Sequence, residues 1–109
     1  MAFQAIVVLI TVPSVEVGQQ IANLLVEKKL AACVNIIPAV NSLFRWQGQV
    51  SQEQEALLVV KTRTELFEDG LVPAVKKAHP YEVPEIIALP VMMGLREYLD
   101  WIENETSKQ

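Results

Sequence analysis

The sequence carries one long apolar run, Phe3-Gln4-Ala5-Ile6-Val7-Val8-Leu9-Ile10-Thr11-Val12, which has almost no polar face. Apolarity of this length predicts a β-strand that is covered on both of its faces. Pro13-Ser14 follows as a strand breaker and a helix N-cap. Apolar side chains then recur at helical spacing, at Val17, Ile21, Leu24 and Leu25. We therefore expect a strand and then an amphipathic helix that ends around Lys28-Lys29.

The middle of the chain predicts a long, bent β-hairpin. Residues 31–37 alternate between two faces, with Val34 and Ile36 on one and Cys33 and Asn35 on the other. Pro38 has no N–H to donate, so it predicts a sheet edge or a bulge. Residues 47–49 predict a turn, with the sequence Gln-Gly-Gln, and residues 56–60 predict the return strand. We expect the tip of the hairpin near residues 48–54.

A second helix, a strand and a last short helix complete the predicted elements. Thr64 is the expected N-cap of the second helix, and Gly70 and Pro73 predict a kink or break because an interior proline costs roughly 3 kcal/mol. The His79-Pro80 step ends this helix at Ala78, and an extended loop follows. Residues 86–91 then predict an edge strand, residues 95–102 a short helix, and residues 105–109 a frayed end.

This order, β-α-β-β-α-β-α, predicts the fold class. Four strands with two helices on one side are typical of a ferredoxin-like, two-layer α+β sandwich. We expect a single domain over residues 1–109, with the last helix as an appendage. The strands are apolar on both faces, so the face without helices needs a cover. Another copy of the chain is the simplest candidate.

Composition excludes several classes of partner. The 109 residues are 51% hydrophobic and carry a net charge of −4. No basic stripe is present, so nucleic acid is not expected as a partner. The apolar run is too short to cross a bilayer, which takes about 20 residues, so we expect no membrane partner. The single cysteine cannot form an internal disulfide, and we therefore predict a cytoplasmic location.

Several segments, taken in order and spacing, resemble one known family. They are Leu30-Ala31-Ala32-Cys33-Val34-Asn35-Ile36-Ile37-Pro38, Ser42-x-Phe44-x-Trp46-x-Gly48, Glu55 followed by Lys61-Thr62, His79-Pro80-Tyr81-Glu82-Val83-Pro84-Glu85-Ile86, and Tyr98-Leu99-x-Trp101-Ile102. From about Ile6 to Ile102 the chain is similar to the CutA family, known as divalent-cation tolerance proteins. The resemblance implies a ferredoxin-like subunit in a homotrimer, with hairpins that wrap neighbouring subunits, and a link to copper and other divalent ions.

Three positions depart from the family's pattern. In relatives for which copper binding is described, the ligands include a cysteine in the first strand and paired histidines before Pro-Tyr. Ile10 and Ala78 stand at the corresponding positions here, which leaves His79. Phe44 replaces the tyrosine that is usual in the Ser-x-Tyr-x-Trp-x-Gly pattern.

The loop His79-Pro80-Tyr81-Glu82-Val83-Pro84-Glu85 is the candidate site for a divalent metal. Imidazole is a common metal ligand, and Cu²⁺ heads the affinity order of divalent ions, so we predict His79 and Glu82 as ligands and copper as the metal. The alternative is that His79 only caps a helix and contacts a neighbouring subunit. Tyr81 and Glu85 are candidates for an intersubunit cleft.

Three further residues are candidates for that cleft or interface. Cys33 is either a small buried apolar side chain or a thiol with redox or ligand chemistry. Lys61, at the end of an apolar strand, either reaches an anion in the cleft or extends to solvent. Trp46 either lines a pocket or packs at a trimer interface.

No nucleophile–base pair, phosphate-binding glycine loop or nucleotide fingerprint is present, so we do not expect an enzyme. The predicted function is divalent-cation tolerance through binding of copper or another divalent ion. The alternative is a trimeric signalling protein, similar in build to PII proteins, that binds a small molecule or a protein in its intersubunit clefts.

Overall fold

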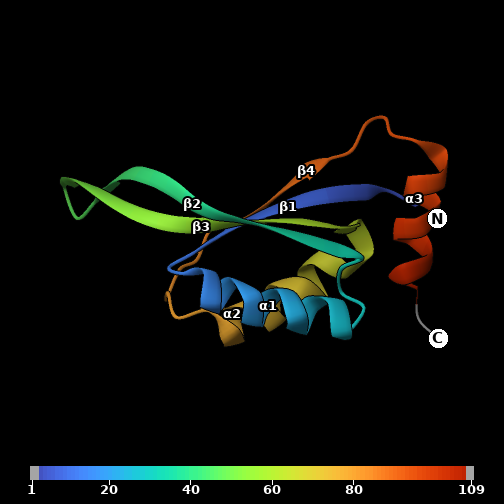
Figure 1. Ribbon diagram of the computed structural model, residues 1–109, viewed down its shortest axis with the longest axis horizontal. Coiled ribbons are helices and arrows are strands. Elements are labelled where there is room, and N and C mark those ends of the chain that lie inside the picture. Colours follow the sequence, from blue (N-terminus) through green and yellow to red (C-terminus); the bar gives the residue numbers. More distant parts are fainter. Residues whose placement is uncertain (1–2, 108–109) are drawn as a thin grey trace.

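The chain folds into a four-stranded antiparallel sheet with two helices on one face and a third helix at one end (Figure 1). The computed structural model describes residues 3–107. Its elements are β1 (Ala5–Val12), α1 (Val15–Glu27), β2 (Cys33–Trp46), β3 (Gln49–Arg63), the 3₁₀ turn η1 (Thr64–Leu66), the π-type turn η2 (Phe67–Leu71), α2 (Val72–Ala78), β4 (Ile86–Pro90) and α3 (Arg96–Glu105). The strand order β2-β3-β1-β4 confirms the predicted ferredoxin-like α+β fold.

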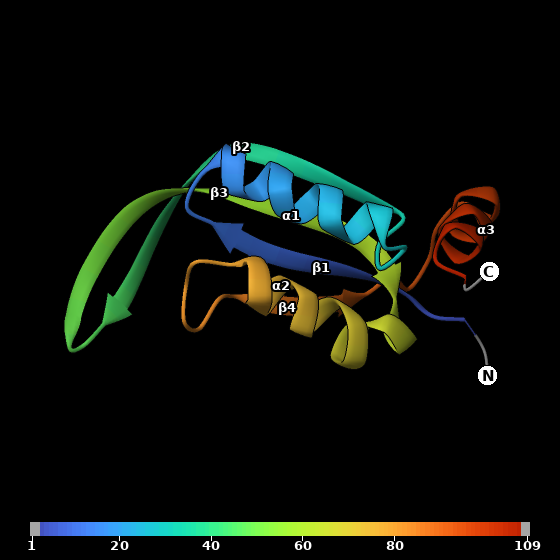
Figure 2. The same cartoon turned by 90° about the horizontal axis from the view of Figure 1, so that it is seen from below.

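Helices α1 and α2 lie side by side on one face of the sheet (Figure 2). The predicted cap of α1 is confirmed, because the Ser14 hydroxyl accepts a hydrogen bond from the Val17 N–H at 3.2 Å. Helix α1 ends at Glu27 with Lys28 as its C-cap, close to the predicted end around Lys28-Lys29. Burying one large apolar side chain contributes about 1.5–3 kcal/mol, so the face that α1 and α2 share with the sheet dominates the stability of the subunit.

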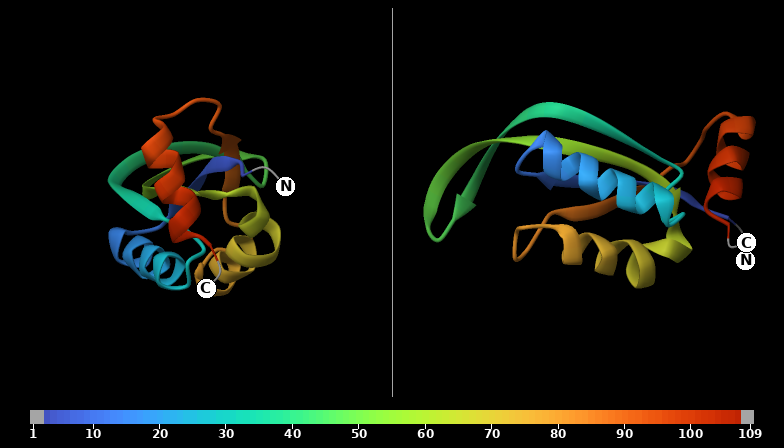
Figure 3. Two further views of the ribbon diagram at one scale, coloured as in Figure 1. Left: turned by 90° about the vertical axis from the view of Figure 1, so that its right-hand side faces the viewer. Right: turned by 60° about the horizontal axis from the view of Figure 1, so that its bottom comes forward.

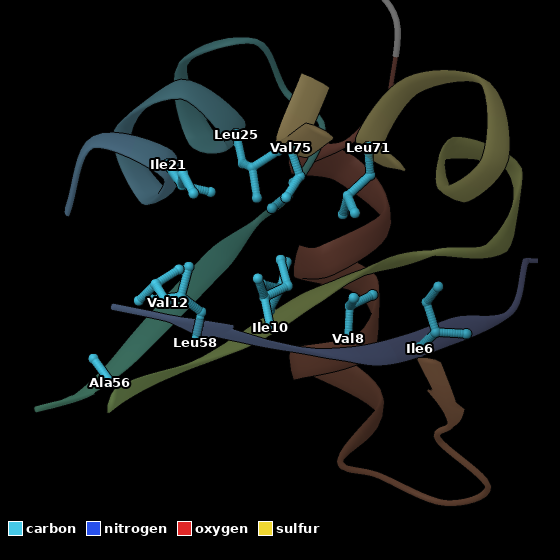
Figure 4. Close-up of a cluster of buried hydrophobic side chains, with 12 residues drawn as sticks. Ile6, Val8, Ile10, Val12, Ile21, Leu25, Ala56, Leu58, Leu71 and Val75 are labelled. Carbon is cyan, nitrogen blue, oxygen red and sulfur yellow. The ribbon is translucent and has the colours of Figure 1, made fainter. Parts of the chain in front are cut away.

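The core lies between the two helices and the even-numbered residues of β1 and β3 (Figure 4). Side chains of β1 alternate, so that Val8, Ile10 and Val12 point to the helices and are fully buried. Ile21 and Leu25 from α1 and Leu71 and Val75 from the second helical segment close the core from above in Figure 4. Alternation of this kind leaves the odd-numbered strand residues on the opposite face.

The hairpin is longer and its turn tighter than the sequence predicted. Strands β2 and β3 pair as far as Trp46 and Gln49, and only Gln47 and Gly48 form the turn. Both turn residues have positive φ, 51° and 79°, and a two-residue turn with two positive φ values matches the twist of the strands. The expected tip at residues 48–54 is therefore wrong beyond Gly48. The predicted irregularity at Pro38 is confirmed, since the register shifts between Ile37 and Val40.

The second helical segment divides into three pieces. Thr64 is not its cap, because no side chain caps η1 and the Thr64 N–H instead bonds to the Gln4 carbonyl at 3.1 Å. The expected break is confirmed: Pro73 lies in the first turn of α2, where a missing N–H costs no helical hydrogen bond. Gly70 lies in η2, where an added Cβ would come within 2.7 Å of the Leu30 side chain.

Helix α3 lies across the end of the sheet and packs against β1 and β3 (Figure 3). The expected fraying does not hold for residues 105–107, since Thr106 is buried and its hydroxyl donates to the Ile102 carbonyl at 2.8 Å. Residues 108–109 lie outside the described part of the chain.

In the described part of the chain, no helix covers the second face of the sheet (Figure 1). Paired odd-numbered residues form rows across this face, among them Leu9 beside Val59 and Ile87 beside Leu9. Ile87 and Leu89 on the edge strand β4 are 50% and 51% exposed. An apolar sheet face of this size is unusual for a subunit that stays alone in water. We name these side chains the open face: Val7, Leu9, Ile37, Leu57, Val59, Ile87 and Leu89.

Candidate functional site

The imidazole of His79 is buried and both of its nitrogens are hydrogen-bonded. His79 forms the C-cap of α2, and its backbone turns to φ −86° and ψ 135°, as a residue before proline prefers. Its Nε2 lies 2.7 Å from the Thr11 carbonyl oxygen, and its Nδ1 lies 3.1 Å from the backbone nitrogen of Tyr81. A carbonyl can only accept and an N–H can only donate, so the ring fits as the neutral tautomer with hydrogen on Nε2.

The bond from Tyr81 to the ring also explains why the loop is not extended. Residues 80–83 bend, whereas the two proline steps predicted an extended segment. The Tyr81 N–H donates to the side chain two residues earlier, and a local bond of this kind bends the backbone back on itself. The Tyr81 ring then lies 4.7 Å from the imidazole, centroid to centroid.

Tyr81 connects this loop to the hairpin. Its hydroxyl donates to Oε2 of Glu55 at 2.8 Å, and Glu55 is buried, with 8% of its surface exposed. Burial raises the pKa of Tyr81 to about 12, and the hydrogen bond and charge of Glu55 and the charge of Glu53 add to the shift. Tyr81 is therefore a neutral donor at physiological pH. The chain of bonds from Thr11 through His79 and Tyr81 to Glu55 joins β1, the loop and β3.

The predicted metal ligands differ in their availability. Glu82 and Glu85 are exposed, so their carboxylates can meet a cation from solution. His79 can ligate a metal only if it gives up its bond to Thr11 or to Tyr81. Among residues 3–107, no three His, Cys, Asp or Glu side chains are grouped so that they can hold a metal ion within one subunit.

Cys33 and Lys61 lie together at another place, on the open-face side of the sheet. The two residues are paired across β2 and β3, and the Lys61 Nζ lies 3.9 Å from the Cys33 Sγ. The Lys61 ammonium also donates to Oδ1 of Asn35. Burial raises the pKa of Tyr98, on α3, and its electrostatic interaction with Cys33 adds to the rise. This corner, formed by Cys33, Asn35, Lys61 and Tyr98, is named the lysine corner below.

Trp46 belongs to neither cluster. It is the last residue of β2 before the turn and is 60% exposed at the hairpin tip, remote from α3 in Figure 1. The candidate residues are thus distributed over three places: the His79 loop, the lysine corner and the hairpin tip.

Four contributors to these clusters were not among the predicted site residues. Thr11 takes part through its backbone carbonyl, which no side-chain pattern identifies. Glu55 and Tyr98 lie within the segments that resemble the family. Glu55 is the last of the polar residues 51–55 before the apolar run 56–60, so its burial had no signal in the sequence. Asn35 carried its own signal as a polar residue within the apolar stretch 31–37.

The three departing positions have different surroundings. Ile10 is fully buried and points into the helix–sheet core. Ala78 is exposed at the end of α2, next to the buried ring of His79. Phe44 is 38% exposed on the hairpin.

Comparison with known proteins gives consistent matches over nearly the whole chain. A family model described as CutA1 divalent ion tolerance protein matches residues 6–105. The divalent-cation tolerance protein CutA of Thermus thermophilus is 59% identical over 92% of this chain and 96% of its own length. Its solved structure gives a TM-score of 0.92 over 94% of this chain and 99% of that one.

Two further relatives bear on location. The chloroplastic protein CutA of Arabidopsis thaliana is 48% identical over 94% of this chain but only 56% of its own length. The solved structure of a CutA from Archaeoglobus fulgidus, described as periplasmic, gives a TM-score of 0.91 at 43% identity over 94% of this chain and 99% of that one. The predicted cytoplasmic location is therefore wrong as an inference from this sequence. A lone cysteine cannot pair within its chain in any compartment, so it does not distinguish between them. The structure describes no helix in residues 3–107 that is long and apolar enough to span a membrane.

Proposed function

Because this chain belongs to the CutA1 divalent ion tolerance family, we propose that it acts in cation tolerance as a homotrimer that binds copper or another divalent cation. In this proposal the protein binds the cation and does not catalyse a reaction. The single observation that carries the assembly is the open face, and the exposed carboxylates of the His79 loop carry the cation site.

The open face supports self-association on physical grounds. It presents aliphatic side chains on all four strands, and the edge strand β4 contributes two that are half exposed. Removing apolar surface from water stabilises by about 25 cal/mol per Å², so covering such a face is strongly favourable. In a closed assembly with rotational symmetry, the open faces of all copies are covered in the same way. A homotrimer is the closed assembly that fits the family.

The carboxylates of the His79 loop support weak cation binding. Glu82 and Glu85 are exposed and follow the ring of His79 by three and six residues. Oxygen ligands bind divalent ions of many kinds, and an added imidazole favours copper. His79 joins the ligand set only when one of its two hydrogen bonds opens, which lowers its affinity for the metal. Cation binding at this loop is therefore weaker than at a preformed site.

Calorimetric titration with Cu²⁺ tests the cation site, with light scattering on the same samples to test the assembly. We expect the parent protein to have three times the mass of one chain and to release heat on binding Cu²⁺. Glu82→Gln should weaken binding by about fivefold or more, since it removes one charged ligand while keeping the shape of the side chain. Glu97→Gln, an exposed carboxylate in the first turn of α3, is the matched control and should bind as the parent does.

Equal affinities for the parent and Glu82→Gln would remove Glu82 from the site. A well-folded monomer at micromolar concentration would contradict the assembly, because the open face would then tolerate water.

A further inference from the structure

Residues 40–55 form an arm that projects from the body of the subunit (Figure 2). The pairing of β1 with β3 ends at Val12 and Ala56, so among residues 3–107 the strands of the arm pair only with each other. The arm exposes four large apolar side chains, Leu43, Phe44, Trp46 and Val50. A two-stranded hairpin on its own is marginally stable in water, so an arm of this composition needs a cover.

Glu55 lies at the base of this arm and is a buried carboxylate without a cation. Its side chain is 8% exposed, and its Oε2 accepts the 2.8 Å hydrogen bond from the Tyr81 hydroxyl. Among residues 3–107, the one ion pair within 4.0 Å joins Arg63 to Glu65, so no Lys or Arg in this range neutralises Glu55. Glu53, two residues away on the same side of β3, adds a second negative charge. A charge taken out of water without a partner is strongly unfavourable, so this carboxylate is suited to a cation from outside the subunit.

Arg45, near the tip of the arm, is the one cation of residues 40–55. It is exposed and lies directly opposite Val50, so these two side chains point to the same side of the arm. Val50 and Glu55 are five residues apart in β3, which corresponds to about 16 Å at about 3.3 Å per residue. Because five is an odd number, Arg45 and Glu55 also point to opposite sides of the arm. Arg45 therefore cannot reach Glu55 of its own subunit.

The arm thus carries a cation near its tip and a buried carboxylate at its base. If the tip of one copy meets the base of the next, both charges gain a partner, and the apolar side chains beside Arg45 are covered in the same contact. Such a contact joins two different surfaces and closes into a ring when the rotation between copies permits. Glu55 follows Leu57 on the same side of β3, so the base of the arm is continuous with the open face.

We propose that Glu55 binds the guanidinium group of Arg45 from a neighbouring copy of the chain, and that the Tyr81 hydroxyl holds the Glu55 carboxylate in position for it. A carboxylate accepts several hydrogen bonds, so Glu55 can accept from Tyr81 and from an N–H of the guanidinium at the same time. Leu43 and Val50, on the side of Arg45, enter the same contact. The inference deepens the proposed function, because it rests on the homotrimer and names the residues that two copies bring together.

A double-mutant cycle tests the pair, because Arg45 and Glu55 can contact each other only across a subunit boundary. Glu55→Gln keeps the shape of the side chain and an oxygen for the Tyr81 hydroxyl, and Arg45→Gln changes an exposed residue. Thermal unfolding is measured at one protein concentration, with light scattering on every sample. We expect Glu55→Gln to lower the Tm of the parent by at least about 5 °C, since removing one partner of a buried ion pair is destabilising. In the Arg45→Gln protein the same substitution should leave the Tm unchanged or raise it, because the buried charge that it removes has already lost its partner.

Two other cations provide the controls. Arg96 is exposed at the start of α3, and Glu55→Gln should lower the Tm of Arg96→Gln as much as that of the parent. Lys61 lies on the open-face side of β3, and the effects of Lys61→Gln and Glu55→Gln should likewise be additive.

A trimeric parent in which Glu55→Gln has the same effect with and without Arg45, or in which it raises the Tm, would overturn the pair. Coupling of Glu55 to Lys61 in place of Arg45 would overturn it as well and would assign the cation to Lys61 of the neighbouring copy. A monomeric parent contradicts the proposed assembly instead, and it is recognised by its mass before any variant is compared.

Discussion

Replacing His79 by alanine separates the structural role of the ring from a role as metal ligand. The substitution removes the bonds to the Thr11 carbonyl and the Tyr81 N–H, at 2.7 and 3.1 Å, from a side chain that is 6% exposed. Each bond contributes about 0.5–1.5 kcal/mol, and loss of the buried ring adds about 1 kcal/mol. We therefore expect the free energy of unfolding to fall by about 2–4 kcal/mol. For a domain of about 100 residues this corresponds to roughly 8–16 °C in Tm.

The assay is urea unfolding followed by circular dichroism, at one fixed protein concentration, with a chelator present so that metal cannot contribute. Glu82→Gln is the control: its carboxylate is exposed, and we expect a change within about 0.5 kcal/mol. Repeating both unfolding curves with Cu²⁺ measures how much stability the metal adds to each protein. The reasoning is refuted if His79→Ala unfolds like the parent in chelator but is no longer stabilised by Cu²⁺. In that case the imidazole would be a ligand and its bonds to the loop and to β1 would be dispensable.

Three other substitutions test the fold and the site. The folded-state pKa of Tyr81, about 12, lies above the ordinary value of 10, so its contribution to stability is present below pH 10 and is lost as the pH rises from 10 to 12. A pKa raised from 10 to about 12 implies roughly 2.7 kcal/mol, which solvent screening reduces to roughly 1 kcal/mol. The free energy of unfolding of Tyr81→Phe should therefore fall by about 1 kcal/mol less than that of the parent between pH 10 and pH 12. Leu89→Glu places a charge on the open face at a position that is 51% exposed, and size-exclusion chromatography should show dissociation; an unchanged trimer would exclude Leu89 from the interface. Leu25→Ala empties a fully buried core position and should cost about 2–5 kcal/mol in thermal unfolding, and a loss below 1 kcal/mol would mean that the core collapses around the gap.

The fold was predictable from the sequence because its main signals are local. The continuous apolar run of β1 requires cover on both faces, and the Ser14 cap with apolar residues at helical spacing defines α1. Together with the remaining periodic segments they leave few topologies, since crossovers between parallel strands are right-handed. The places where the prediction was wrong have weak local signals. The tip of the hairpin depends on the φ values of Gln47 and Gly48, and the polar residues after the turn resemble a loop although they form a strand.

The site was predictable only in part, because its bonds join residues that are far apart in sequence. The local pattern of prolines and aromatic groups predicted His79 as a site residue. Its role is set by the Thr11 carbonyl 68 positions away and by the contact of Tyr81 with Glu55, 26 positions away. A backbone carbonyl has no sequence signature, so no spacing rule could predict that both nitrogens of the ring are hydrogen-bonded. The association of Lys61 with Cys33 and Asn35 likewise depends on strand register.

The replaced positions restrict how this chain can bind a cation. The side chain of Ile10 lies among Val8 and Val12 in the helix–sheet core, with no exposed surface, so a ligand at this position would have to bring a metal into an apolar interior. Ala78 is exposed but carries no donor atom. The cation site that we propose therefore lies in the loop after α2, where Glu82 and Glu85 face solvent and His79 is hydrogen-bonded to Thr11 and Tyr81. A metal that binds Nδ1 of the imidazole must release the Tyr81 N–H, and that release would loosen the bond from Tyr81 to Glu55 on β3. Copper binding through Nδ1 would thus change the hairpin strand at Glu55, whereas binding through the carboxylates alone would leave the hairpin unchanged.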